Sequence, residues 1–139
     1  MRIKVREGSE YLKGMLLLAR KDRKIADSEI RLVKHVGEAL GFDTRFCADA
    51  IGEVLENKYL VDTPPEFSSA GLAEKFVRDG LVLAASDSEV HPSEEKWLKS
   101  AVAKNGLCLA WFRQECADVT AKVRFLSRLD VDDLAVEYC

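Results

Sequence analysis

Apolar residues recur at intervals of three and four along most of this chain, the spacing that places them on one face of an α-helix. Six such stretches and a short seventh predict helices over about residues 9–21, 27–40, 44–56, 69–85, 92–105, 109–126 and 130–138. No stretch alternates apolar and polar residues long enough to predict a strand, and residues 1–8 are expected to form an extended lead-in. The pattern therefore predicts an all-α fold, a bundle of six or seven helices joined by short loops.

Residues that start and stop helices stand at the predicted boundaries. The side chains placed to cap helix N-termini are Ser9, Asp43 or Thr44, and Ser68 or Ser69. Pro92 suits the first position of a helix, because a proline there loses no internal hydrogen bond. Gly41 is placed to end the second helix. The Pro64-Pro65 pair predicts a linker between the third and fourth helices.

The chain also repeats itself, because residues 16–42 and 81–107 align without a gap. The identical pairs are Leu16/Leu81, Leu18/Leu83, Ala19/Ala84, Asp22/Asp87, Ser28/Ser93, Glu29/Glu94, Lys34/Lys99 and Gly41/Gly106. Such repetition predicts one helix–turn–helix unit used twice, as two three-helix repeats related by a pseudo-two-fold axis. We expect one domain over residues 1–139: repeat one at about 9–57, a linker at 58–68, repeat two at about 69–126 and a tail at 127–139.

Length and composition fit one soluble helical domain. The 139 residues are 47% hydrophobic and 32% charged, which is enough to bury a core without disulfides or metal ions. A net charge of −3 requires neither nucleic acid nor an anionic membrane as a partner. Lys and Arg nevertheless dominate residues 1–36, and Asp and Glu dominate residues 128–139. The basic N-terminal part is therefore a candidate interaction surface, although charged helix faces are more often simply solvated.

The cysteines predict reduced thiols rather than a metal site. They are Cys47, Cys108, Cys116 and Cys139; they form no CxxC pair, and zinc-ligand spacing with His35 or His91 is absent. The first three lie in amphipathic stretches, where a free cysteine behaves as a small core hydrophobe. The sequence shows no signal-like or membrane-spanning apolar run, so the expected location is the cytoplasm.

In both repeats an aspartate follows the first helix and a glutamate opens the second. The pairs are Asp22 with Glu29 and Asp87 with Glu94. With Pro92 in the first helical position, Glu94 is third, and the alignment gives Glu29 the same place. A glutamate there can accept a hydrogen bond from a free backbone N–H group at the helix start, where its charge also suits the helix dipole. All four acids thus have a purely structural explanation.

A second explanation applies if the pseudo-two-fold brings the two turns together. Four carboxylates with nearby carbonyls would then form a hard, oxygen-rich site for Ca²⁺ or Mg²⁺. In the second turn, Glu89 and Glu95 add further oxygens. In the first turn, Lys21, Arg23 and Lys24 would oppose a cation, or else pair with the acids of the second turn. The spacing matches no EF-hand loop.

Each repeat has a helix that ends in Ala-x-x-Asp, an apolar residue (Ile25 or Val90) three positions after the Asp, and a glutamate at the start of a long amphipathic helix. Over about residues 12–126 this pattern resembles the TerB-like family, which includes tellurite-resistance proteins. The resemblance implies an all-helical, internally pseudo-symmetric bundle. It also implies a role in stress-response complexes near the cytoplasmic face of the membrane, rather than catalysis. By this resemblance, the residues expected to bind a divalent metal ion are Asp22, Glu29, Asp87 and Glu94.

The chain departs from the family pattern in its turns. Arg23 and Ser88 stand where the family often has glycine, and His91 stands where it has a capping serine. These departures bear on metal binding more than on the fold.

No residue set for catalysis emerges, because the chain has neither a glycine-rich phosphate loop nor a nucleophile motif. The aromatic residues Trp97, Trp111 and Phe112 fall on apolar stripes expected in the core.

Together with the family resemblance, these observations lead us to expect a non-enzymatic module with protein partners and no small-molecule substrate, which binds a divalent cation and acts in a stress-response or envelope-associated assembly. The alternative is a metal-independent adaptor whose basic N-terminal surface binds an acidic protein, membrane headgroups or nucleic acid. Nucleic acid is the weakest of these, because no aromatic residue interrupts the basic cluster at residues 20–24.

Overall fold

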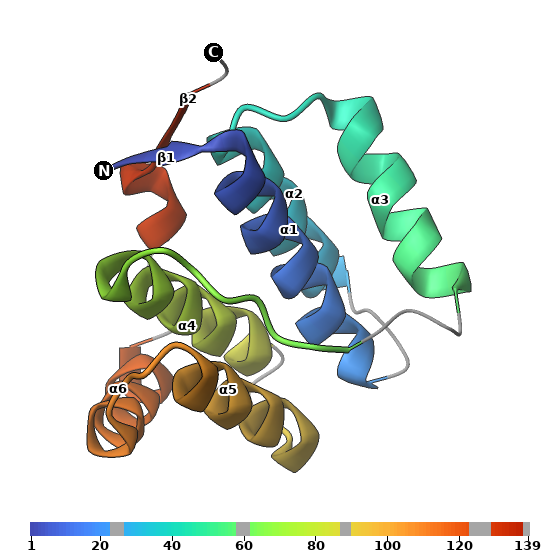
Figure 1. Ribbon diagram of the computed structural model, residues 1–139. Helices are drawn as coiled ribbons and strands as arrows, with labels where there is room; N and C mark the ends of the chain where they lie inside the picture. The colour runs from blue at the N-terminus through green and yellow to red at the C-terminus, as the bar shows by residue number, and fades with distance from the viewer. Residues whose placement is uncertain (23–26, 58–61, 87–89, 123–128, 138–139) are drawn as a thin grey trace.

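The computed structural model describes residues 1–22, 27–57, 62–86, 90–122 and 129–137, and it is predominantly helical (Figure 1). The α-helices are α1 (Val5–Ala19), α2 (Asp27–Ala39), α3 (Thr44–Glu56), α4 (Ala70–Ala85), α5 (Pro92–Lys104) and α6 (Leu109–Lys122). The shorter elements are the 3₁₀ turns η1 (Arg20–Asp22) and η3 (Asp130–Asp133) and the strands β1 (Arg2–Lys4) and β2 (Ala135–Glu137). The all-α class predicted from the apolar spacing is confirmed.

Helices α1 and α4 form the centre of the molecule. They pack against each other; α1 also contacts α2 and α3, whereas α4 also contacts α5 and α6 (Figure 1). Because each central helix has neighbours on several sides, its apolar residues cover more than one stripe. Leu16 and Leu18 of α1 and Leu81 and Leu83 of α4 are all buried. The core therefore lies along these two helices.

Most of the predicted helix boundaries are confirmed. The side chain of Asp43 accepts a hydrogen bond from the backbone N–H of Arg45 at 2.8 Å, and that of Ser69 accepts one from Leu72 at 3.2 Å. Pro92 is the first residue of α5. After α2 the chain turns at Gly41 with a φ of 80°, a conformation that favours glycine. Residues 62–67 are irregular, as the linker predicts.

The start of the first helix differs from the prediction. Ser9 does not cap α1, which begins four residues earlier at Val5 directly after β1. Lys4 is its N-cap and makes no side-chain capping bond. A Cβ added to Gly8 would lie 3.3 Å from Val136. This helix start is therefore held by packing against the far end of the chain, which no local capping signal reveals.

The expected last helix over residues 130–138 is also wrong. Its first part is the 3₁₀ turn η3, and its second part is β2, which pairs in parallel with β1. The register joins Arg2 to Ala135, Ile3 to Val136 and Lys4 to Glu137. Strands of three residues are too short to show an alternating pattern, and their pairing depends on residues from opposite ends of the chain.

Burial of the cysteines and aromatic residues agrees with the predictions only in part. Cys47, Trp97 and Phe112 are buried as expected. Cys108, which lies just before α6, is exposed. The backbone N–H groups of Trp111 and Ala110 lower the pKa of its thiol. Cys116 and Trp111 are half-buried, and Cys139 lies outside the described residues.

Two further expectations fall partly outside the described residues. The sixth helix is described as far as Lys122, so its predicted continuation to residue 126 lies beyond that description, as do linker residues 58–61. Within the described residues, none of the helices combines the length and the apolar character that crossing a bilayer would require.

Candidate functional site

The two glutamates of the repeated turns occupy equivalent places in the structure. Glu29 is the third residue of α2, and Glu94 is the third residue of α5, as the sequence predicts. Both are buried, with exposed fractions of 2% and 0%. Glu94 accepts a hydrogen bond from the backbone N–H of His91 at 3.1 Å, so it satisfies one of the N–H groups that every helix start leaves free.

The first turn lies against the second half of the molecule. The turn η1, which follows α1, packs on α5, which is the helix that follows the second turn. The first turn thus contacts the helix that opens with Pro92, Ser93 and Glu94. The side chain of Asp22 and the whole of Asp87 and Glu89 lie outside the described residues.

Arg20 and Lys21, at the start of the first turn, are held by the end of α3 and by the linker. Lys21 Nζ lies 2.6 Å from an Asp62 carboxylate oxygen. The carbonyl oxygen of Asp62 accepts a hydrogen bond from Trp97 Nε1 at 2.8 Å, which ties this segment to α5. Arg20 Nη1 donates to the carbonyl oxygen of Asn57 at 3.0 Å, just after α3 ends. Lys21 thus pairs with Asp62, whereas Arg23, Lys24, Asp87 and Glu89, which the suggested pairing also involves, lie outside the described residues.

Among the residues that the structure describes, no three histidine, cysteine, aspartate or glutamate side chains gather closely enough to hold a metal ion. Glu29 and Glu94 belong to the described residues, whereas Asp87 does not. The four-carboxylate site therefore stays a prediction.

A second polar cluster, centred on Asp79 of α4, was not anticipated. Its carboxylate is 3% exposed and accepts three hydrogen bonds. Oδ2 accepts from the Tyr11 hydroxyl at 2.5 Å and from the backbone N–H of Val131 at 2.9 Å. Oδ1 accepts from the backbone N–H of Asp130 at 2.7 Å. One buried carboxylate thereby joins α1, α4 and η3.

Ion pairs surround this cluster and fix the acidic turn η3. Arg78 lies 3.4 Å from both Asp130 and Glu115, and its guanidinium lies over the Trp111 ring at 5.4 Å. His35 Nε2 lies 2.8 Å from an Asp132 oxygen. These contacts bind Asp130 and Asp132 to the bundle, so η3 is an internal structural element rather than a free charged segment.

The sequence contained one signal for Asp79. Buried Leu72, Phe76 and Leu83 lie on one helical stripe, and Asp79 falls on the same stripe. An acidic residue in a core position needs hydrogen-bond partners. Those partners come from residues 11, 130 and 131, and only the folded chain brings them together.

Burial raises the pKa of Asp79 to about 7, although the hydrogen bonds from Tyr11, Asp130 and Val131 act in the opposite direction. Burial also raises the pKa of the Tyr11 hydroxyl, and the charge of Asp79 raises it further. The Asp130 carboxylate adds to the raised pKa of Asp79. Asp79 therefore changes its charge near neutral pH.

The stability of the protein should depend on pH through this residue. An unfolded aspartate has a pKa near 4, whereas folded Asp79 has a pKa of about 7. The part of its contribution to stability that comes from the raised pKa is therefore fully present below about pH 4 and declines as the pH rises to about 7, whereas its hydrogen bonds contribute separately. Urea unfolding across this pH range should show that wild type loses about 2–4 kcal/mol of unfolding free energy relative to Asp79→Asn as the pH rises. A difference that stays constant with pH would contradict this assignment.

Comparison of the chain with family models, curated proteins and solved structures gives no match. The site must therefore be interpreted from its own geometry.

Proposed function

We propose that this chain is a non-enzymatic helical module of the TerB-like kind, which binds a divalent cation at its repeated acidic turns. It would act in a stress-response or envelope-associated protein assembly. The observation that carries the proposal is the burial of Glu29 and Glu94 at the third position of α2 and α5, with η1 packed against α5. Two carboxylates are thereby held inside the protein at equivalent positions of two helices.

The helix contacts support a duplicated architecture. Helix α1 packs with α2 and α3, α4 packs with α5 and α6, and the two groups meet where α1 and α2 lie against α4. Two three-helix units related by a pseudo-two-fold axis would give the contacts within each group and the one between α1 and α4. The same symmetry would relate Asp22 to Asp87 and Glu29 to Glu94 (the aligned pairs of the repeat).

The chemistry of these residues suits a hard cation. Carboxylate oxygens are the ligands that Ca²⁺ and Mg²⁺ prefer. The residues that would hold the ion are Asp22, Glu29, Asp87 and Glu94. A bound cation would offset the cost of burying negative charge and would join the two turns. Pairing of Lys21 with Asp62 supports this proposal, because it balances a positive charge beside the first turn.

Isothermal titration calorimetry with Ca²⁺ and with Mg²⁺ tests the cation. Wild type should release or absorb heat and should melt at a higher temperature in millimolar metal, because an ion that binds only the folded state stabilises it. Asp87→Asn/Glu94→Gln should lose both effects. Glutamine keeps a side-chain oxygen at position 94 that can still accept the hydrogen bond from the His91 N–H.

The matched control is Asp49→Asn/Glu53→Gln, which makes the same charge change at two exposed positions of α3. This control should bind metal as wild type does. Equal loss in both double variants would point to diffuse charge attraction, and no heat or melting shift in wild type at millimolar metal would sink the cation proposal.

A further inference from the structure

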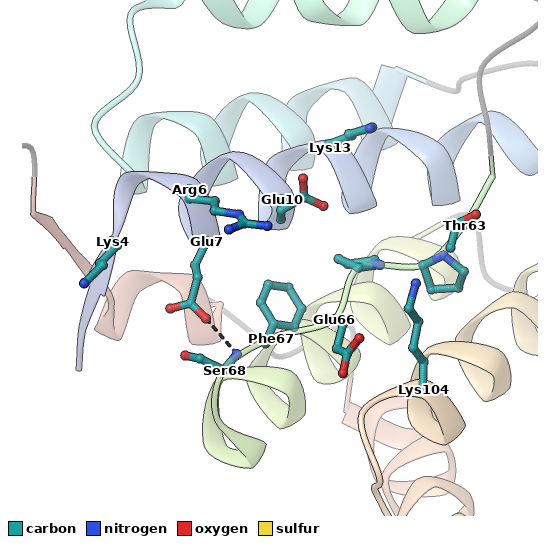
Figure 2. A pocket seen from close by; sticks show the side chains of 12 residues that line it. Lys4, Arg6, Glu7, Glu10, Lys13, Thr63, Glu66, Phe67, Ser68 and Lys104 are labelled. Atoms are coloured by element: carbon teal, nitrogen blue, oxygen red, sulfur yellow. Dashed lines mark hydrogen bonds between the residues drawn. The ribbon is translucent and has the colours of Figure 1, made fainter.

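A groove runs along one side of α1. One wall is α1 with the residue before it, and the other is the extended segment of residues 63–68 that leads into α4 (Figure 2). Lys104, at the end of α5, projects toward the part of the segment that holds Thr63. The groove has a volume of about 870 Å³, which is in the range of sites that bind ligands or short peptide segments.

The segment that forms the second wall is fixed on both sides. The carboxylate of Glu7 on α1 accepts a hydrogen bond from the Ser68 backbone N–H at 2.8 Å (Figure 2). The Asn105 side chain accepts from the backbone N–H of Phe67 at 2.8 Å and donates to the carbonyl oxygen of Pro65 at 2.9 Å. Phe67 is itself buried in the core. The groove is therefore preformed, and a ligand would not have to order it.

Cationic side chains outnumber carboxylates in this preformed groove by four to three. Its four cationic side chains, which form no ion pair within the described residues, are Lys4, Arg6, Lys13 and Lys104. Of its three carboxylates, Glu7 is engaged with Ser68, which leaves Glu10 and Glu66. By contrast, Lys21, Lys75 and Arg78 elsewhere in the molecule are paired with acids.

The dimensions and the mixture of charges favour one kind of occupant. Lys4 and Lys13 are nine positions apart in sequence, which is about 13 Å along a helix and corresponds to about four residues of extended peptide at roughly 3.3 Å each. A continuous phosphate backbone would bring negative charge past Glu10 and Glu66. A peptide can place acids opposite the cations and uncharged residues opposite those two carboxylates, because side chains alternate along an extended strand.

We infer that this groove binds a short, extended, aspartate- and glutamate-rich segment of a partner protein. Arg6 and Lys13 would hold its acidic side chains along α1, with Lys4 and Lys104 toward the ends. The inference is independent of the cation site, since none of the four predicted metal ligands lines the groove. A partner held by exposed charges binds with an affinity that falls as salt rises.

Fluorescence anisotropy tests this inference with a short fluorescein-labelled peptide of alternating aspartate and alanine, in chelator at low ionic strength. Wild type should bind the peptide, and Arg6→Glu/Lys13→Glu should weaken binding by about tenfold or more, because like charges then face each other. The matched control Lys96→Glu/Lys122→Glu reverses two exposed lysines on α5 and α6 and should weaken binding by less than about threefold through the change in net charge alone. The chelator ensures that failure here is separate from failure of the cation proposal.

A gain-of-affinity variant guards against misfolding as the cause of a loss. Glu66→Lys removes one of the two remaining carboxylates of the groove and should tighten peptide binding severalfold. Equal weakening by the groove pair and the control pair, or no tightening by Glu66→Lys, would overturn the inference. Labelled oligothymidylate or phosphatidylserine vesicles that bind at least as tightly as the peptide, and lose binding in the same groove variant, would assign the groove to a polyanion instead.

Discussion

Asp79→Ala is expected to lower the free energy of unfolding by about 3–5 kcal/mol at neutral pH, because it leaves three donors without an acceptor, two of them buried. Those donors are the Tyr11 hydroxyl and the backbone N–H groups of Asp130 and Val131. Val131 is fully buried, so water cannot replace the lost partner at that residue. Urea unfolding followed by far-ultraviolet circular dichroism measures the change.

Two variants separate this effect from a general loss of packing. Tyr11→Phe removes only one of the three donors and should cost about 0.5–2 kcal/mol. Glu74→Ala breaks a partly exposed ion pair to Arg78, 3.7 Å long, on the same helix, and should cost less than about 1 kcal/mol. If Asp79→Ala costs no more than Glu74→Ala, the carboxylate does not hold η3 in place.

The sequence predicts the helices well where the signal is local. Asp43, Ser69 and Pro92 start helices as expected, and Gly41 ends one, because capping and glycine conformation depend on a few neighbouring residues. The apolar stripes likewise predict which helices have buried faces.

The two ends of the chain could not be predicted in the same way. Ser9 is a good capping residue by type, but α1 already runs through it, since β1 pairs with β2 and the helix packs on Val136. Residues 130–133 form a 3₁₀ turn, and the side chain of Asp79 holds this turn by accepting hydrogen bonds from two of its backbone N–H groups. Contacts between residues more than fifty positions apart in sequence produce no periodic pattern in either segment.

The candidate sites likewise combine local features that the sequence predicts with long-range contacts that it does not. Repetition alone places Glu29 and Glu94 at equivalent helix positions, and the structure confirms both places. The preformed groove needs Glu7 to meet Ser68 and Asn105 to meet Pro65 and Phe67. The sequence indicated a basic N-terminal surface, but it could not show that a linker would lie beside that surface and turn it into a groove.

The groove also depends on the core beneath it. Phe67 of the linker packs on Phe76 of α4, with ring centroids 5.2 Å apart, and on Tyr11 of α1 at 5.9 Å. A Cβ added to Gly14 of α1 would lie 2.6 Å from the Phe76 ring and 3.1 Å from Pro65. The backbone of α1, the linker and α4 therefore meet around one aromatic ring.

Phe76→Ala is expected to lower the free energy of unfolding by about 3–5 kcal/mol, the usual cost of removing a buried phenylalanine. The Phe76 side chain is fully buried. Its ring meets Tyr11 edge-on at 5.3 Å and lies 6.1 Å from Trp97. Because these neighbours belong to different elements, they cannot close together over the cavity without moving whole helices. Urea unfolding followed by tryptophan fluorescence reports both the stability and the surroundings of Trp97.

Phe76→Leu is the matched control, because it keeps most of the apolar volume and should cost about half as much as Phe76→Ala. The alanine variant should also weaken binding of the acidic peptide under conditions where it is still folded, since Phe67 loses the ring that supports it. The leucine variant should bind the peptide nearly as wild type does. If both variants bind as wild type does, the groove is held by Glu7 and Asn105 alone, and the core beneath it contributes stability but not recognition.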